Sequence, residues 1–275
     1  MGEVIACANQ KGGVGKTTTV VNLASYLARS GCRILIVDLD PQGNATSGVG
    51  LGGREVDRSI YPVLLGSGNL QDLIVEAAIE GLSIIPSSRD LAGAEVELVP
   101  LAGRERRLSK ALAPVRDQFD YVLMDCPPSL GLLTVNALTA ADSVLIPLQS
   151  EYYALEGLGQ LLATIDLVRA HLNPDLAIKG VVLTMFDART TLAADVSAEV
   201  RRHLGDQVFQ TQIPRSVRLA EAPSYGRPIS EYSPASRGAQ AYAALAAELL
   251  ARDGGTVPAV LTQPDVASPA WATRA

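Results

Sequence analysis

The sequence predicts an α/β fold in which helices cover both faces of a mainly parallel, twisted sheet. Short apolar runs rich in Val, Ile and Leu alternate along the chain with longer segments of helical periodicity. Such runs are typical of strands buried on both faces, and strands that alternate with helices form parallel sheets. A glycine-rich loop joins the first apolar run to the first helical segment, which is the order of a recurring strand–loop–helix motif.

The elements can be placed in chain order from these patterns. Strands are expected at residues 4–8, 32–37, 82–86, 119–125, 143–148 and 178–184, with a short one ending at 213–214. Helices are expected at residues 19–28, 58–80, 90–117 (broken near Pro100), 130–140, 151–171, 191–204 and 236–251. Ser129 is a candidate cap of the helix that follows it. Residues 45–53 are rich in glycine and are expected to form a mobile loop.

The domain organisation follows from where periodicity stops. Residues 1–252 are expected to form a single domain, because no repeat or linker divides them. Residues 253–275 are rich in Pro, Ala and Thr with little periodicity, so we expect a disordered tail.

Residues 10–18, which read QKGGVGKTT, predict a phosphate-binding loop. Backbone N–H groups and a helix N-terminus converge on an anion in this context, and glycines let the backbone approach phosphate oxygens. Lys16 is expected to reach the β- and γ-phosphates, and the Thr17 hydroxyl to bind Mg²⁺. The strict pattern has glycine at position 10, whereas this chain has Gln10 and an additional lysine, Lys11.

Acidic residues follow two of the expected strands. Asp38 and Asp40 come directly after the second strand, and Asp125 ends the strand at 119–125. Ligands of open α/β sheets bind at the carboxyl ends of the strands, so these side chains are expected at the nucleotide site. Asp125 fits a Walker B acid, which supports Mg²⁺ through a bound water.

Composition limits the other classes of function. The net charge of −6 argues against a generally basic nucleic-acid-binding protein. Cys7, Cys32 and Cys126 are far apart and form no CxxC pattern, so neither a disulfide framework nor a zinc site is expected, and the cytoplasm is the expected location. No apolar segment approaches the length of a transmembrane helix, and the first strand begins within about four residues, so neither a transmembrane helix nor a signal peptide is expected.

The positive charge is gathered towards the C-terminal third. Residues 188–237 contain seven arginines and five acids, which give a net charge of +2. Because the whole chain has a net charge of −6, the remaining residues together carry −8. A basic patch of this kind suits phosphate contacts without base reading. A solvated helix face remains the alternative, most of all for Arg201 and Arg202.

Five motifs together resemble the ParA/Soj-type chromosome and plasmid partition ATPases of the deviant Walker A, MinD-like group. They are KGGVGKTT at 11–18, DLDPQGN at 38–44, YVLMDCPPS at 121–129, EYYALEG at 151–157 and IPRSVRLAEAPSYGR at 213–227. The resemblance covers the chain from residue 3 to about 250 and implies a phosphate-loop NTPase fold.

The resemblance implies a homodimer that encloses ATP and Mg²⁺ and hydrolyses ATP weakly without a partner. Lys11 would reach the phosphates of the other subunit, as an arginine finger does, and Gly12 would lie at the interface. Asp40 would position the attacking water, and Thr17 and Asp125 would support Mg²⁺. The implied nucleotide-binding set is Lys11, Gly12, Gly13, Val14, Gly15, Lys16, Thr17 and Thr18, and the implied catalytic set is Lys11, Lys16 and Asp40.

Two further regions acquire roles from the same resemblance. Pro214 and Ser216 would contact adenine; many relatives have asparagine where this chain has Ser216, so an amide's paired donor and acceptor is lost. Arg189 and Arg218 would bind double-stranded DNA non-specifically in the ATP dimer. A ParB-type centromere-binding protein would stimulate hydrolysis and release the dimer from the nucleoid.

Other functions stay open at this point. A ParA-like ATPase that positions non-DNA cargo, or a nucleotide-switched DNA-binding regulator of replication or transcription, would share the same motifs. A MinD-like membrane cycle needs an amphipathic C-terminal helix, which the proline-containing tail does not supply, and a nitrogenase-iron-protein-like reductase needs paired cysteines. Glu151 is open between helix capping and nucleotide sensing at the dimer interface, and Tyr152 and Tyr153 are expected to be packing residues.

Overall fold

The computed structural model describes residues 2–52, 58–151 and 154–262, and its centre is an eight-stranded sheet. The strand order is β3-β4-β2-β5-β1-β6-β7-β8, and all neighbours pair in parallel except β3 with β4. The strands are β1 (Glu3–Cys7), β2 (Ile34–Asp38), β3 (Val75–Glu76), β4 (Leu82–Ile85), β5 (Tyr121–Asp125), β6 (Ser143–Gln149), β7 (Ala177–Phe186) and β8 (Val208–Pro214). The predicted fold class, a mainly parallel α/β sheet, is confirmed.

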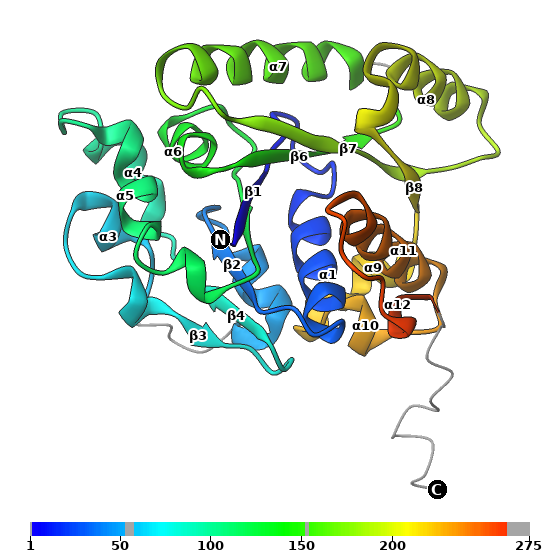
Figure 1. Cartoon of the computed structure of the whole chain (residues 1–275), viewed down its shortest axis with the longest axis horizontal. Coiled ribbons are helices and arrows are strands. Elements are labelled where there is room, and N and C mark those ends of the chain that lie inside the picture. Colours follow the sequence, from blue (N-terminus) through cyan, green and yellow to red (C-terminus); the bar gives the residue numbers. More distant parts are fainter. Residues whose placement is uncertain (1, 53–57, 152–153, 263–275) are drawn as a thin grey trace, which may run out of the picture.

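Helices cover both faces of this sheet (Figure 1). One face packs against α3 (Tyr61–Leu65), α4 (Leu91–Glu97), α5 (Arg107–Leu112), α6 (Leu132–Ala140), α7 (Ala154–His171) and α8 (Thr191–Leu204). The other face packs against α1 (Lys16–Arg29), α2 (Asn44–Thr46), α9 (Val217–Glu221), α10 (Ile229–Tyr232), α11 (Arg237–Arg252) and α12 (Ala259–Thr262).

The central strand shows why apolar runs predict this arrangement. In β1, Val4 and Ala6 face one core, whereas Ile5 and Cys7 face the other, and each is at most 1% exposed. Successive side chains of a strand point to opposite faces, so a strand between two helical layers must be apolar throughout. Its carboxyl end then leads directly into the phosphate loop and α1.

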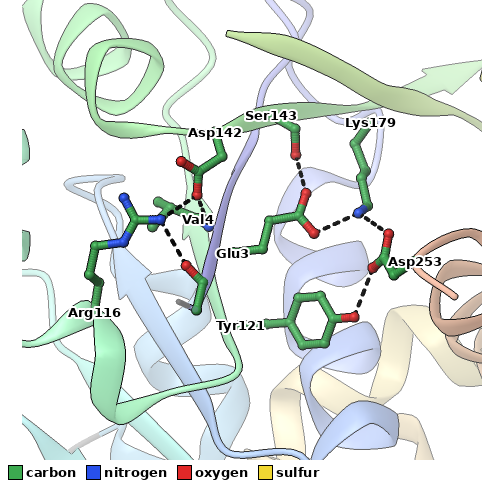
Figure 2. Close-up of polar contacts among 9 residues, drawn as sticks. Glu3, Val4, Arg116, Tyr121, Asp142, Ser143, Lys179 and Asp253 are labelled. Carbon is green, nitrogen blue, oxygen red and sulfur yellow. Dashed lines mark hydrogen bonds and ion pairs between the residues drawn. The ribbon is translucent and has the colours of Figure 1, made fainter. Parts of the chain in front are cut away.

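The opposite, amino edge of the sheet carries a network of paired charges, which we call the amino-edge network (Figure 2). Lys179 lies between Glu3, 2.6 Å from its Oε2, and Asp253. The Tyr121 hydroxyl donates to Asp253 at 2.7 Å, and Ser143 donates to Glu3 at 2.8 Å. The side chains thus tie four strands to the chain just beyond α11.

A second ion pair lies beside this network and joins the turn before β5 to the residue before β6. Arg116 lies 2.6 Å from Asp142, which also accepts the backbone N–H of Val4 at 2.8 Å (Figure 2). Arg116 donates to the carbonyl of Gly2 as well, at 2.8 Å. The beginning of β1 is therefore fixed by charged side chains on both sides.

Two segments differ from the expectation. Residues 45–53 were expected to be a mobile loop, but α2 and a π-helical turn at Ser47–Leu51 occupy most of them, with Ala45 and Val49 buried against α1 and its neighbours. Residues 58–80 do not form one helix, because Gly66 ends α3 with φ +95° and the chain continues through a 3₁₀ turn at Leu70–Leu73 into β3. The apolar spacing in this segment comes from separate short elements.

Regular structure also continues past residue 252, where the tail was expected to begin. Asp253 belongs to the amino-edge network, and α12 follows with Leu261 only 5% exposed. A helix of four residues is too short to show periodicity in the sequence. Regular structure therefore continues to Thr262, and the remainder of the expected tail, 263–275, lies outside the described residues.

Candidate functional site

The phosphate loop lies at the carboxyl edge of the sheet, between β1 and α1. Gly13 and Gly15 have φ of +73° and +89°, a conformation that favours glycine. The Thr184 hydroxyl at the end of β7 donates to the Val14 carbonyl at 2.8 Å and so fixes the loop against the sheet. The first turn of α1 begins at Lys16, so the helix N-terminus faces the loop, as an anion site requires.

The two lysines of the loop differ in position. Lys16 is 6% exposed, and its Nζ donates to the Lys11 carbonyl at 3.2 Å. The Lys11 side chain is 41% exposed, and its Nζ lies 2.5 Å from Oε2 of Glu151, whose other oxygen accepts from Gln149. One lysine is thus directed inward within the loop, and the other is held outside it by an exposed ion pair.

Three carboxylates meet at the same edge. Asp38 and Asp125 are fully buried at the ends of neighbouring strands and are paired in register, and Asp40 is 8% exposed. Burial raises the pKa of Asp38 to about 6. Burial, followed by the negative charge of Asp38, raises the pKa of Asp125 well above its usual range.

The donor set around Asp125 fits Mg²⁺. The Thr17 hydroxyl donates to Oδ2 of Asp125 at 2.7 Å, while buried Oδ1 has no hydrogen-bond partner among the described residues. Nowhere in the described part of the chain do three or more His, Cys, Asp or Glu side chains form a cluster that could hold a metal. The Thr17 hydroxyl and the Asp125 carboxylate are the kind of protein oxygens that magnesium sites combine, one or two at a time, with substrate phosphates and water.

Of the three glycines in the loop, Gly12 is the one whose position would also accept a side chain within one chain. A Cβ at Gly12 would lie 3.7 Å from Cβ of Pro128, an ordinary contact, and its φ is outside the left-handed range. A side chain there would be tolerated within one chain, unlike at Gly13 or Gly15.

A cavity of about 330 Å³ adjoins the loop. It is lined by Gly15 and Thr18 on one side and by Pro214 and Ser216 on the other. The structure therefore brings the two residues expected at adenine next to the phosphate loop. The sequence did not indicate Met185, which also lines this cavity and has φ of +49°, because a strained backbone leaves no local pattern in a β-branched run.

The two arginines expected to bind DNA are exposed and paired with nearby acids. Arg189 lies 2.7 Å from Asp187, and its hydrogen bonds lower the pKa of that carboxyl to about 2. Arg218 lies 2.9 Å from Glu221. Both guanidinium groups lie on the surface, and Arg215 is exposed between them in the sequence.

The cap expected from Ser129 is replaced by a side chain from another helix. Glu95 of α4 accepts from the backbone N–H of Leu132 at 2.8 Å and of Leu133 at 3.3 Å, at the start of α6. Because Glu95 is 37 residues from Leu132, no local pattern could have indicated it. Tyr152 and Tyr153 lie outside the described residues.

Fold and site together define a phosphate-loop nucleotide-binding protein of the α/β class. A family model described as an AAA domain matches residues 2–178. The sporulation initiation inhibitor protein Soj of Bacillus subtilis is 57% identical over 251 residues, which cover 91% of this chain and 99% of that protein. The chromosome partitioning protein ParA of Myxococcus xanthus is 54% identical over 253 residues, which cover 92% and 89%.

A solved structure agrees with these relatives in fold. Cobyrinic acid a,c-diamide synthase from Mycobacterium smegmatis, with bound ATP analog and magnesium, has a TM-score of 0.80 and 42% identity, covering 93% of this chain and 98% of that one. The chain belongs to the ParA/Soj family of chromosome-partitioning ATPases. Among the described residues, none of the helices has the length and apolar character needed to cross a membrane.

Proposed function

We propose that this protein binds ATP with Mg²⁺, dimerises around the nucleotide, and hydrolyses it to drive the segregation of a chromosome or plasmid. The observation that carries the proposal is the different position of the two lysines of one loop. Lys16 is buried where it can hold its own subunit's phosphates, and Lys11 is outside where it can reach another subunit.

Binding of the nucleotide uses the loop and the neighbouring cavity. Backbone N–H groups of residues 11–18 would hold the phosphates, with Thr18 at the α-phosphate. Thr17 would coordinate Mg²⁺, and Asp125 would hold one of its waters. Pro214 and Ser216 would contact adenine in the 330 Å³ cavity.

Dimerisation would follow from the charge of the bound triphosphate. The Lys11–Glu151 ion pair is exposed, and such pairs are worth about 0–1 kcal/mol, so phosphate oxygens of a second subunit can displace Glu151. In this proposal Glu151 would act as a nucleotide-sensing residue, one of the two roles expected for it. Gly12 would lie at the interface, where a side chain would prevent close approach.

Hydrolysis would depend on Asp40. One of its carboxylate oxygens accepts the N–H of Gln42 at 2.9 Å, and within the described residues the other oxygen receives no hydrogen bond. That oxygen is available to orient a water for in-line attack on the γ-phosphate. Lys11 and Lys16 would stabilise the charge of the transferring group, and the reaction would be weak without a partner.

The ATP dimer would hold DNA through exposed arginines. Arg189 and Arg218 would exchange their acidic neighbours for phosphates, which binds DNA without reading bases. A ParB-type partner would stimulate hydrolysis and release the dimer, so the protein would be cytoplasmic and associated with the nucleoid.

The variant Asp40→Ala tests this function. We expect it to bind ATP and Mg²⁺, to form a dimer that stays on random-sequence DNA, and to hydrolyse ATP at least about 100-fold more slowly than the parent. Hydrolysis at the parent rate would contradict the role of Asp40. Preference for one DNA sequence would favour a transcription or replication regulator, and ATP-dependent dimers without DNA affinity would favour a positioner of non-DNA cargo.

A further inference from the structure

Two buried hydroxyl groups lie beside the carboxylates of the site without belonging to any of its motifs. Thr46 is in α2 and is 5% exposed, and Ser87 follows β4 and is 7% exposed. Their partners are Asp38 and Asp40, although Ser87 is 47 residues from Asp40 in the sequence. Buried hydroxyl groups are hydrogen-bonded, and the choice of partner shows what they hold in place.

One path of hydrogen bonds runs from Ser87 to the backbone nitrogen of Asp40. The N–H of Ser87 donates to Oγ1 of Thr46 at 3.1 Å, and the Thr46 hydroxyl donates to Oδ2 of Asp38 at 2.7 Å. The same Asp38 oxygen accepts the N–H of Thr46 at 2.8 Å. The other oxygen of Asp38 accepts the N–H of Asp40 at 3.2 Å.

A second path runs directly to the backbone carbonyl of Asp40. The Ser87 hydroxyl donates to it at 2.7 Å, and the N–H of Gly43 donates to it at 2.9 Å. Among the described residues, Ser87 provides the one hydrogen bond to Asp40 from outside residues 38–43. Both sides of the Asp40 backbone are thus fixed to the end of β4.

This fixation determines where the Asp40 carboxylate points. The carboxylate has one oxygen bound to Gln42, and its direction otherwise follows from the backbone that Ser87 holds. A group that orients water must stay in place, because a displacement of about 1 Å can cost on the order of 100-fold in rate.

We infer that Ser87 is a positioning residue for hydrolysis, which holds the Asp40 backbone so that the free carboxylate oxygen faces the attacking water. Thr46 completes the same support through Asp38. This inference rests on the role proposed above for Asp40. It adds to the reaction a residue from the segment that follows β4, a part of the chain that contains none of the family's motifs quoted above.

The neighbouring serine supplies a matched control. Ser88 is partly buried, and its hydroxyl donates to Oγ of Ser59 at 3.1 Å, away from Asp40. Ser87→Ala and Ser88→Ala each remove one hydroxyl from adjacent positions. Only the first removes a hydrogen bond to Asp40.

The test is steady-state ATP hydrolysis by the full chain, with ATP-dependent dimerisation and the melting temperature measured in parallel. We expect Ser87→Ala to lower kcat roughly 10-fold, the loss of one well-placed hydrogen bond, with KM for ATP and dimerisation within about twofold of the parent. Ser87→Thr should recover most of kcat because it keeps the hydroxyl, and Ser88→Ala should leave kcat unchanged.

A parent-like kcat for Ser87→Ala, or a loss that Ser88→Ala reproduces, would overturn the inference. If Ser87→Ala does not fold, Thr46→Val compared with Thr46→Ser decides the question, since only Thr46→Ser keeps the path through Asp38. Asp40→Ala in the same assay separates the two proposals. Full hydrolytic activity of Asp40→Ala would contradict the role proposed for Asp40. If Asp40→Ala is inactive but Ser87→Ala has the activity of the parent, only the positioning role of Ser87 is contradicted.

Discussion

The two edges of the sheet treat buried charge in opposite ways. At the amino edge, Lys179 has a side chain only 10% exposed and lies between Glu3 and Asp253 (Figure 2). At the carboxyl edge, Asp38 and Asp125 are fully buried side by side, and Lys16 offsets their repulsion only in part.

This difference in charge pairing indicates that the amino edge contributes to stability and the carboxyl edge to function. A buried charge that is paired inside the fold contributes to holding the chain together, whereas uncompensated negative charge costs stability until a cation arrives. The amino edge therefore behaves as a structural joint and the carboxyl edge as a binding site. Variants of each edge should respond differently.

Removal of the inner lysine should abolish function at the carboxyl edge. We expect Lys16→Ala to weaken ATP binding by at least about 100-fold, because we propose that the buried ammonium contacts the phosphates directly. Titration with a fluorescent ATP analogue measures this, with the exposed Lys110→Ala as control. An unchanged dissociation constant would remove Lys16 from the site.

A side chain at Gly12 should block dimerisation and leave nucleotide binding intact. Space exists around Gly12 within one chain, so Gly12→Val should fold and bind ATP but remain a monomer. Gly159→Val is a matched control, since no atom of the described residues lies within 4 Å of a Cβ at Gly159. Light scattering with ATP and Mg²⁺ measures the mass in solution. If Gly12→Val dimerises with the same affinity as the parent, Gly12 does not lie at the dimer interface.

Removal of the Lys179 ammonium from the amino-edge network should lower the stability of the fold without changing the rate of ATP hydrolysis. Lys179→Met leaves the carboxylates of Glu3 and Asp253 without the cation between them, so we expect the free energy of unfolding to fall by about 2 kcal/mol. Urea denaturation measures it, and hydrolysis per folded molecule should be unchanged. A selective loss of kcat at full stability would assign the amino edge a role in the reaction.

The opposite result is expected at the carboxyl edge. Asp125→Asn removes a buried charge, one oxygen of which has no hydrogen-bond partner among the described residues. It should therefore stabilise the nucleotide-free protein by about 1 kcal/mol while impairing Mg²⁺-dependent hydrolysis. An acid with a raised pKa costs stability when it is ionised, so the stability difference from the parent should narrow as the pH falls through that pKa. Thermal melts at several pH values measure the difference, and a less stable variant at neutral pH would contradict the account.

The smallest effect is expected from the ion pair that holds Lys11. Glu151→Gln keeps the side-chain shape and removes the charge, so ATP-dependent dimerisation should strengthen about threefold, in line with an exposed pair. Sedimentation velocity measures it, with Glu156→Gln as the control on the same segment. Weaker dimerisation would show that Glu151 supports the dimer directly.

The sequence indicated many of the residues that lie at the carboxyl edge of the sheet, whereas it did not indicate the amino-edge network. The loop glycines, the lysines and Asp125 stand in contiguous motifs, because phosphate and Mg²⁺ chemistry demands fixed residue types at short spacing. Lys179, Asp253 and Glu3 come from three distant segments, and only the folded sheet brings them together.

The same reasoning explains the missed details of the fold and the site. Glu95 and Ser87 act through single long-range hydrogen bonds, which leave no periodicity or motif. Residues 58–80 were predicted to be a helix because several short elements in sequence can have the apolar spacing of a helix by chance. Strands buried on both faces were predictable, since burial on both sides forces an apolar run.

The most direct test of a nucleotide site shared by two chains is the mass of Asp40→Ala in solution, where slow hydrolysis preserves ATP. Sedimentation velocity with ATP and Mg²⁺ should show a dimer, and ADP, or ATP with EDTA, should leave a monomer. Adding Lys11→Ala to the same chain should abolish the dimer while ATP still binds. A dimer of equal affinity without Lys11, or a monomer under every condition, would contradict the account.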